Sequence, residues 1–222
     1  MGAMLSKANR LYWLGRYNER LYTSLQYMTR LFDQAIDGPP INYPDICTRL
    51  AVPNIYGDAS DFLNRFTFDI KSPDSIASTA DKMLGNGMVL RETISSNTLS
   101  YLQMAVNALN LASVSVNPVV AMQWVLDDIM AFRGSFDDYI DDETIANILK
   151  CGVSVERVSM YLRLNINQYD SEKELKKLLA SLYKSKLQVQ PSSQATLYEK
   201  VVNGNSPSPE LLLHSVETLF VI

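Results

Sequence analysis

The sequence predicts an all-α protein, a single-domain bundle of about eight helices in which two long helices with a Glu-Arg motif pack together. Three observations predict this fold class. Apolar residues recur with the 3.6-residue period of an α-helix along almost the whole chain. The apolar-polar alternation of a β-strand is not sustained anywhere. Short polar residues, several of them followed by proline, mark helix starts between the periodic segments.

The first helix is expected over residues 5–36, because its helical pattern continues up to Gly38-Pro39-Pro40. Proline removes a backbone donor and clashes with the preceding turn, so no helix continues through this sequence. Further along, Ser or Asn followed by Pro predicts a helix start, as does a Ser followed three residues later by Glu. The starts predicted in this way are Ser72-Pro73, Asn117-Pro118, Ser171 with Glu174, and Ser208-Pro209, which opens an apolar segment at 211–220. Loops are expected at residues 134–141 and 203–207.

Length and composition are those of one globular domain. The chain has 222 residues, of which 47% are hydrophobic and 20% charged, enough to bury a core without disulfides or a structural metal. We interpret residues 1–3 as a cloning remnant and residues 4–222 as the domain. The two cysteines, Cys47 and Cys151, are too few for a disulfide framework and are interpreted as reduced core residues.

The charge and hydropathy of the chain argue against two classes of partner. The formal net charge is −4 and no basic patch is evident, so a nucleic acid is not expected to bind. No apolar segment approaches the ~20 residues that cross a bilayer, and the N-terminus lacks the apolar core of a signal peptide. We therefore expect a cytoplasmic protein without a membrane partner.

A short motif occurs twice, as Gly15-x-x-x-Glu19-Arg20 and as Gly152-x-x-x-Glu156-Arg157, each in a long predicted helix. On a helical wheel, both glutamates lie on faces that are expected to be buried. A buried carboxylate needs cationic or hydrogen-bonding partners, and the available donors include Arg16, Arg20, Arg91 and Arg157. Glycine one turn earlier allows a neighbouring helix to approach closely. The two helices are therefore predicted to share a polar layer of carboxylates and guanidinium groups.

Three blocks of sequence belong with this motif. They are Leu5-Ser6 with Leu11-Tyr12-Trp13-Leu14-Gly15-Arg16-Tyr17-x-Glu19-Arg20, the second Gly152-x-x-x-Glu156-Arg157, and a central segment with Ser72-Pro73-Asp74-Ser75-Ile76 and Asn86 through Arg91-Glu92-Thr93-Ile94-Ser95. With these blocks, the chain resembles the bacterial alpha-E family, a helical domain named for its Glu-Arg motif, from about Leu5 to Arg163. The resemblance adds Asn86 to the candidate layer, which becomes Gly15, Arg16, Glu19, Arg20, Asn86, Arg91, Gly152, Glu156 and Arg157.

The chain departs from the family pattern at two positions. Val153 replaces the Arg that usually follows the glycine of the second motif, and Met88 stands where members often have another Arg. The cationic side of the layer is therefore thinner here. Alpha-E domains are typically associated with ATP-grasp and transglutaminase-like proteins, so the resemblance implies a partner role in a bacterial system of peptide synthesis or modification.

The missing catalytic patterns favour a non-enzymatic partner, and two other readings stay open. The first is an enzyme or small-anion-binding protein that uses the Glu-Arg layer, and the second is a self-contained structural protein. His214 is the only histidine, which removes di-iron and Ser-His-Asp chemistry. Asp137-Asp138-x-x-Asp141 spells a magnesium motif of prenyl-diphosphate enzymes but lacks a second such motif. Gly85-Asn86-Gly87 lacks the third glycine of a nucleotide loop. No metal or cofactor is expected.

Overall fold

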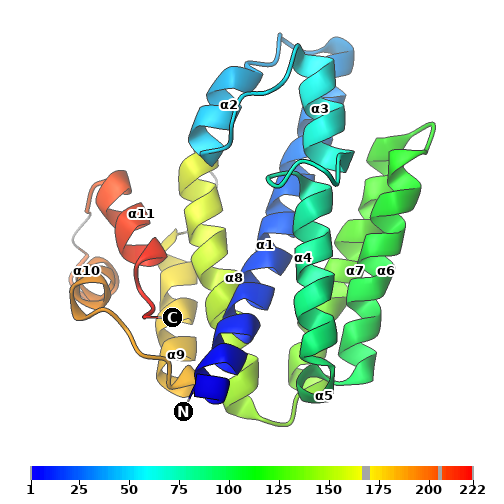
Figure 1. Ribbon diagram of the computed structural model, residues 1–222. Coiled ribbons are helices and arrows are strands. Elements are labelled where there is room, and N and C mark those ends of the chain that lie inside the picture. The colour runs from blue at the N-terminus through cyan, green and yellow to red at the C-terminus, as the bar shows by residue number, and fades with distance from the viewer. Residues whose placement is uncertain (1, 167–170, 205–206, 222) are drawn as a thin grey trace. The chain divides into compact units, whose positions relative to one another are not determined.

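The structure is a computed structural model that describes residues 2–166, 171–204 and 207–221, with side chains described from residue 7 onward and not for residue 171 (Figure 1). Within these ranges the chain is helical, and its only β pairing is an isolated antiparallel bridge between Val189 and Phe220. The helices are α1 (Gly2–Asp37), α2 (Tyr43–Leu50), α3 (Ala59–Phe68), α4 (Ile76–Val89), α5 (Arg91–Ile94), α6 (Ser96–Ser113), α7 (Pro118–Tyr139), α8 (Glu143–Leu164), α9 (Ser171–Ser185), α10 (Pro191–Val202) and α11 (Pro209–Glu217). The all-α class is confirmed for these ranges, which hold eleven helices where about eight were expected.

The chain divides into two compact units, and α1 runs through both of them. Unit 1 comprises residues 1–19 and 141–222, and unit 2 comprises residues 20–140. In the described part of the chain, no helix is both long enough and apolar enough to cross a bilayer.

Unit 1 is built around α8, which packs against α9 and α11, while α10 packs against α9 and α11 (Figure 1). The inner faces are rich in leucine and valine, which are buried on α8, α9 and α11. The chain after α11 returns to the start of the unit, where the Phe220 ring meets the Tyr12 ring edge-on at 5.0 Å. A half-buried ion pair between Arg163 and Glu217 also joins α8 to α11. The first half of α1 is thus held between elements from the C-terminal part of the chain.

Unit 2 is built around an antiparallel pair, α6 and α7, with α4 packed on α6 and α3 packed on α4. Its core is aromatic and aliphatic, and the largest fully buried side chains include Phe62, Met83, Leu102 and Phe132. Some polar contacts in this core are neutral. Ser135, for example, donates to the Phe132 carbonyl oxygen at 2.6 Å and contacts the Thr98 hydroxyl at 3.1 Å.

Several helix boundaries follow from the capping residues in the sequence. α1 ends at Asp37, immediately before Gly38-Pro39-Pro40. Asn117 caps α7 by accepting from the Val120 amide, and Ser208 caps α11 by accepting from the Leu211 amide. Both caps precede a proline in the first turn, where the missing amide is not needed. These predicted starts are confirmed.

Two predicted boundaries are wrong. Ser72-Pro73 does not start a helix; the cap of α4 is Ser75, which accepts from the Ser78 amide. Residues 134–139 are not a loop, because α7 continues to Tyr139 and buries Ser135 and Phe136 in unit 2. Packing of an apolar face outweighs the ~1 kcal/mol that a glycine such as Gly134 costs inside a helix. At Ser171 the predicted cap cannot be assessed, since its side chain lies outside the described residues, although α9 does begin there.

Candidate functional site

The two glycines of the repeated motif lie where α1 and α8 meet inside unit 1. A methyl group on Gly15 would overlap the carbonyl oxygen of Leu149, and one on Gly152 would overlap the carbonyl oxygen of Tyr12. In both cases the distance from the added Cβ to the carbonyl oxygen would be far below 3.0 Å, a separation that real Cβ contacts essentially never show. Only glycine at both positions permits this approach, because any Cβ would push the backbone of the other helix away.

This contact has an approximate two-fold symmetry. Leu149 lies three residues before Gly152, and Tyr12 lies three residues before Gly15, so each glycine faces the equivalent carbonyl of the other helix. The repeat in the sequence is therefore also a repeat in the structure. Each motif continues one turn further to its glutamate, so both carboxylates are carried to the same helix interface.

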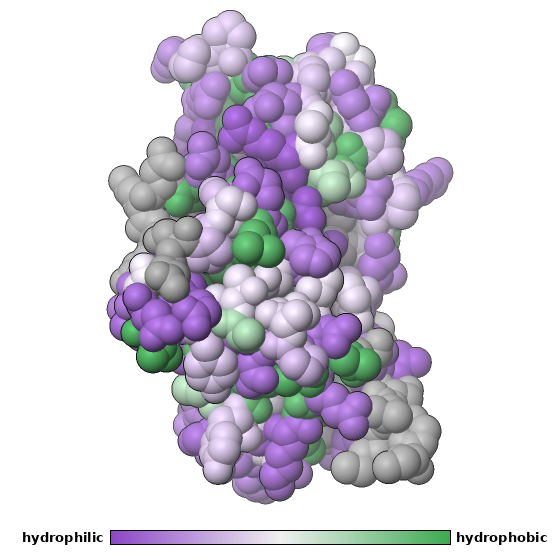
Figure 2. Space-filling model, turned by 90° about the vertical axis from the view of Figure 1, so that its left-hand side faces the viewer, coloured by the Kyte–Doolittle hydropathy of each residue, from purple (hydrophilic) through white to green (hydrophobic). Residues whose placement is uncertain are grey.

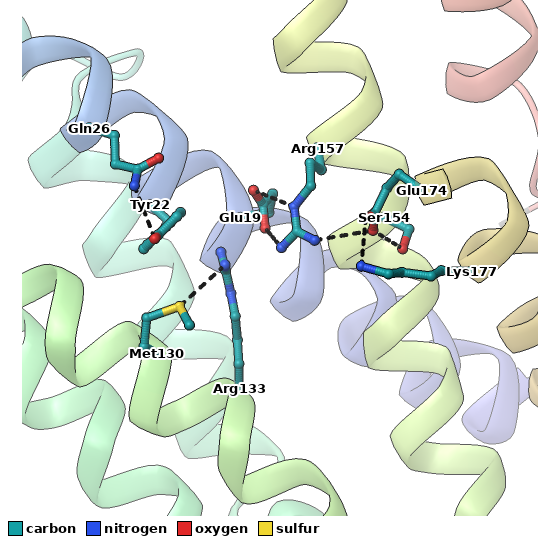
Figure 3. A network of polar contacts seen from close by, with 9 residues as sticks. All are labelled: Glu19, Tyr22, Gln26, Met130, Arg133, Ser154, Arg157, Glu174 and Lys177. Atoms are coloured by element: carbon teal, nitrogen blue, oxygen red, sulfur yellow. Dashed lines mark hydrogen bonds and ion pairs between the residues drawn. The ribbon is translucent and has the colours of Figure 1, made fainter. Parts of the chain in front are cut away.

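Glu19 on α1 forms a bidentate ion pair with Arg157 on α8 (Figure 3). The guanidinium donates through Nε to Oε1 at 3.1 Å and through Nη2 to Oε2 at 2.7 Å. The Glu19 side chain is 0% exposed and that of Arg157 is 20% exposed. Parallel N–H···O bonds of this kind are among the stronger side-chain interactions and also fix the relative orientation of the two groups.

Glu156 on α8 forms the second pair, with Arg16 on α1. Nε of Arg16 donates to Oε2 of Glu156 at 2.6 Å, and the Glu156 side chain is 1% exposed. The Arg16 guanidinium also lies over the ring of Trp13, 4.6 Å from the ring centroid. This placement keeps the cation in a π-rich environment when it is removed from water. In the repeat, the position of Arg16 corresponds to Val153, so the symmetry of the helices does not extend to this arginine.

A third carboxylate joins the site from α9. Glu174 accepts from Nη1 of Arg157 at 3.1 Å, from the Ser154 hydroxyl at 2.7 Å and from Nζ of Lys177 at 3.2 Å (Figure 3). Arg157 thus bridges Glu19 and Glu174 and links three helices. We refer to the following residues as the Glu-Arg layer: Arg16, Glu19, Ser154, Glu156, Arg157, Glu174 and Lys177.

The electrostatics of the layer are those of carboxylates paired with cations. Burial raises the pKa of Glu174, but Arg157, Ser154 and Lys177 lower it, and the net pKa lies below the ordinary value. Burial lowers the pKa of Arg16, but the charges of Glu156, Tyr12 and Glu217 and the hydrogen bond to Glu156 together outweigh it, and the net pKa is raised. The pKa of Tyr12 is raised above its ordinary value, mainly by burial. Three carboxylates and three cations therefore face one another.

The remaining candidate residues belong to unit 2. Arg20 is half-buried in the second half of α1, Asn86 is half-buried on α4, and Arg91 is exposed as the first residue of α5. Sequence reasoning missed Glu174, Ser154 and Lys177. The signal for Glu174 is its place beside the buried Leu175 of an amphipathic helix, where a carboxylate is uncommon unless it has partners.

Other reactive groups in the sequence are not placed for chemistry. Cys47 and Cys151 are buried free thiols, and burial raises the pKa of Cys151 to about 12. A thiol with so high a pKa is not a nucleophile at neutral pH. Asp137 and Asp138 are exposed near the end of α7. Among the described residues, no group of three or more His, Cys, Asp or Glu side chains has an arrangement that could hold a metal ion.

The comparison with protein families gives one match. The model of Alpha-E, described as a predicted alpha-helical domain with a conserved ER motif, matches residues 4–206. This range includes both copies of the Glu-Arg motif, all of unit 2 and most of unit 1. Neither the curated proteins nor the solved structures contain a significant match.

Proposed function

The chain belongs to the Alpha-E family, and from this premise we propose that it is a non-enzymatic helical partner of an ATP-grasp or transglutaminase-like protein. The two partner classes come from what alpha-E domains are typically associated with. The setting is a bacterial, cytoplasmic system that makes or modifies peptides. In this proposal, residues 4–222 form one domain whose two Glu-Arg helices are its central scaffold, and the partner protein carries the chemistry.

The observation that carries the non-enzymatic role is the matching of charges in the Glu-Arg layer. Glu19 and Glu156 are buried and each is held by a guanidinium group at 2.6–3.1 Å. A general base has to reach the proton that it removes from a substrate, and a buried carboxylate already saturated by an arginine does not. The ion pairs of the layer join α1, α8 and α9, which supports a structural role in fixing the register and the separation of these helices.

A second candidate function is the binding of a small anion at the edge of the same layer. Arg157 is partly exposed and Lys177 more so, and both donate to Glu174. An anionic ligand could take the place of the Glu174 carboxylate between these two cations. Against this stands the competition from Glu174 itself, which is covalently tethered at the site and needs no loss of translational freedom to bind.

The partner role is tested by co-purification with ATP-grasp and transglutaminase-like proteins from the organism that makes this chain, beginning with any whose gene neighbours that of the chain. We expect a stoichiometric complex in size-exclusion chromatography, and a rise in the partner's turnover when the chain is added. The chain alone should not turn over the partner's substrates. Glu19→Gln is the matched variant. If Glu19 were catalytic, this variant would still form the complex, but the complex would lose its turnover. Absence of binding to both classes of protein, or turnover by the chain alone, would contradict the proposal.

A further inference from the structure

The hairpin of α6 and α7 in unit 2 has an unusual composition. Between Glu92 and Asp127 the chain carries no charged residue at all, although this stretch includes the whole of α6 and the first turns of α7. Elsewhere in unit 2 acidic residues outnumber basic ones. A helix without charge is normally buried on most of its surface, but α6 is covered only on one side.

The end of the hairpin at which these two helices connect exposes large apolar side chains. Trp124 is 68% exposed and Val114 is 81% exposed, although tryptophan is usually well covered. The exposed apolar residues at this end of the hairpin are Leu111, Val114, Val116, Val120 and Trp124. Monomeric proteins rarely expose contiguous apolar patches beyond a few hundred Å². By contrast, hydrophobic side chains are scattered among hydrophilic ones on the side that carries α10 and α11 (Figure 2).

The polar residues beside these apolar side chains indicate what covers them. The outer side of α6 presents Gln103, Asn107 and Asn110, and Gln123 follows on α7, all of them exposed. Gln103 donates to Asn107 at 3.1 Å and Gln123 donates to Asp127 at 2.8 Å, and each amide keeps further donor or acceptor capacity with which it can pair with an identical group. A charged partner would leave its charges unpaired against this face, and an anionic membrane would need Lys or Arg, which this stretch lacks.

We propose that this face, defined by Leu111, Val114, Val116, Val120 and Trp124, is the contact through which two copies of the chain form a symmetric dimer. In a two-fold interface the same patch meets itself, so it must be self-complementary in shape and charge. Two copies of an acidic chain repel each other unless the contact surface is neutral. The proposed face lies in the long uncharged segment of unit 2. Trp124 is expected at the centre, since tryptophan dominates many interface hot spots. The proposal does not depend on the partner role.

The test is the mass of the purified full chain by multi-angle light scattering over a range of concentrations. We expect twice the 25.0 kDa of one chain. Trp124→Glu and Leu111→Glu place like charges on both sides of the interface and should reduce the species to monomer, with an unchanged helical circular dichroism spectrum. Trp124→Ala should weaken the dimer by about tenfold or more. The control is Tyr183→Glu on α9, an even more exposed aromatic position outside the face, which should stay dimeric.

A second measurement keeps the test decisive if a charged variant folds poorly. In Val116→Cys, mild oxidation should give a disulfide-linked dimer, whereas Tyr183→Cys should not, because the native thiols at Cys47 and Cys151 are buried. A wild-type chain that stays monomeric up to about 0.1 mM would overturn the proposal. A dimer that survives both glutamate substitutions would also overturn it, because the interface would then lie elsewhere. If the wild-type chain is a monomer and Trp124→Glu or Leu111→Glu loses binding to another protein, the face belongs to that protein and the dimer proposal is overturned.

Discussion

The two units differ in the kinds of polar group that they bury and in how those groups are paired. Unit 1 buries ions, and its pairs join residues as far apart in sequence as Arg16 and Glu156. In unit 2, hydroxyl groups pair in the core and the Arg133 guanidinium lies 4.3 Å from the centroid of the Tyr22 ring, while ion pairs such as Arg49 with Asp45 are exposed and lie one helical turn apart. The same chemical pair therefore has a different role in each unit. The buried pairs of unit 1 join separate helices, whereas the exposed pairs of unit 2 that lie one turn apart add a small increment to a helix that already exists.

The sharpest way to test this difference is to remove one buried ion. Glu19→Ala leaves Arg157 without its bidentate partner and should lower the free energy of unfolding by about 3 to 5 kcal/mol. Glu19→Gln keeps the shape and one acceptor, so it should lower it by less. Urea denaturation followed by circular dichroism measures both. If Glu19→Ala unfolds at the wild-type urea concentration, the layer does not stabilise unit 1.

Substitutions at the contact between Gly15 and Gly152 should lower the free energy of unfolding nearly as much as Glu19→Ala. Gly15→Ala and Gly152→Ala each force a methyl group into the backbone of the facing helix, which should cost about 1 to 3 kcal/mol. The matched controls are Gly85→Ala on α4 and Gly134→Ala on α7, where a Cβ meets nothing within 4 Å. The controls should gain up to about 1 kcal/mol from helix propensity. Thermal melts measure all four variants. If Gly15→Ala and Gly152→Ala do not melt at lower temperatures than the two controls, the close approach of α1 and α8 is contradicted.

Acid should weaken the layer through Glu174. Its pKa is lower in the folded protein than its ordinary value of 4.5, so its ionised form favours the folded state. That contribution is complete above about pH 4.5 and is lost as the pH falls through the lower, folded-state pKa. Stability measured against pH should therefore fall less steeply below pH 4.5 in Glu174→Gln than in the wild type. An equally steep fall in both proteins would show that other carboxylates control acid unfolding.

The smallest effect is expected for the surface pair in unit 2. Arg49→Ala removes a partly exposed i,i+4 pair with Asp45 and should lower the free energy of unfolding by only about 0.3 to 0.5 kcal/mol. Raising the salt concentration should shrink this difference further, because exposed charges are screened. An effect as large as that of Glu19→Ala would remove the contrast between the two units.

The sequence predicts those parts of the fold that depend on local chemistry. Asn117 and Ser208 can be identified as caps because a short polar side chain accepts from the amides of the first turn and proline fits the next position, although the same pattern at Ser72-Pro73 does not start a helix. The continuation of α7 past Gly134 was not predicted, since it depends on the burial of Phe136 against the rest of unit 2. Local signals describe one helix at a time, and packing then overrides them where an apolar face is large.

The candidate site shows the same limit. That Glu19 and Glu156 are buried follows from the helical wheel, and glycine one turn earlier indicates a close helix contact. The spacing of Glu174 from Ser171 fits a capping box, so the sequence predicts a helix start there and not a buried ion pair. Its partners Ser154 and Arg157 are on another helix, and no local pattern contains them. Spacing within one helix reveals a buried charge but not the residue across the interface that neutralises it.

The central claim is that the Glu-Arg layer holds unit 1 together, and a double-mutant cycle on Glu19 and Arg157 tests it most directly. The free energies of unfolding are measured for Glu19→Ala, Arg157→Ala and the double variant. Removing both partners leaves no orphaned charge between them, so the double variant should be about 2 to 3 kcal/mol more stable than the sum of the single effects predicts. Single effects that simply add, or wild-type stability in all three variants together with lost partner binding, would contradict a structural role for the layer.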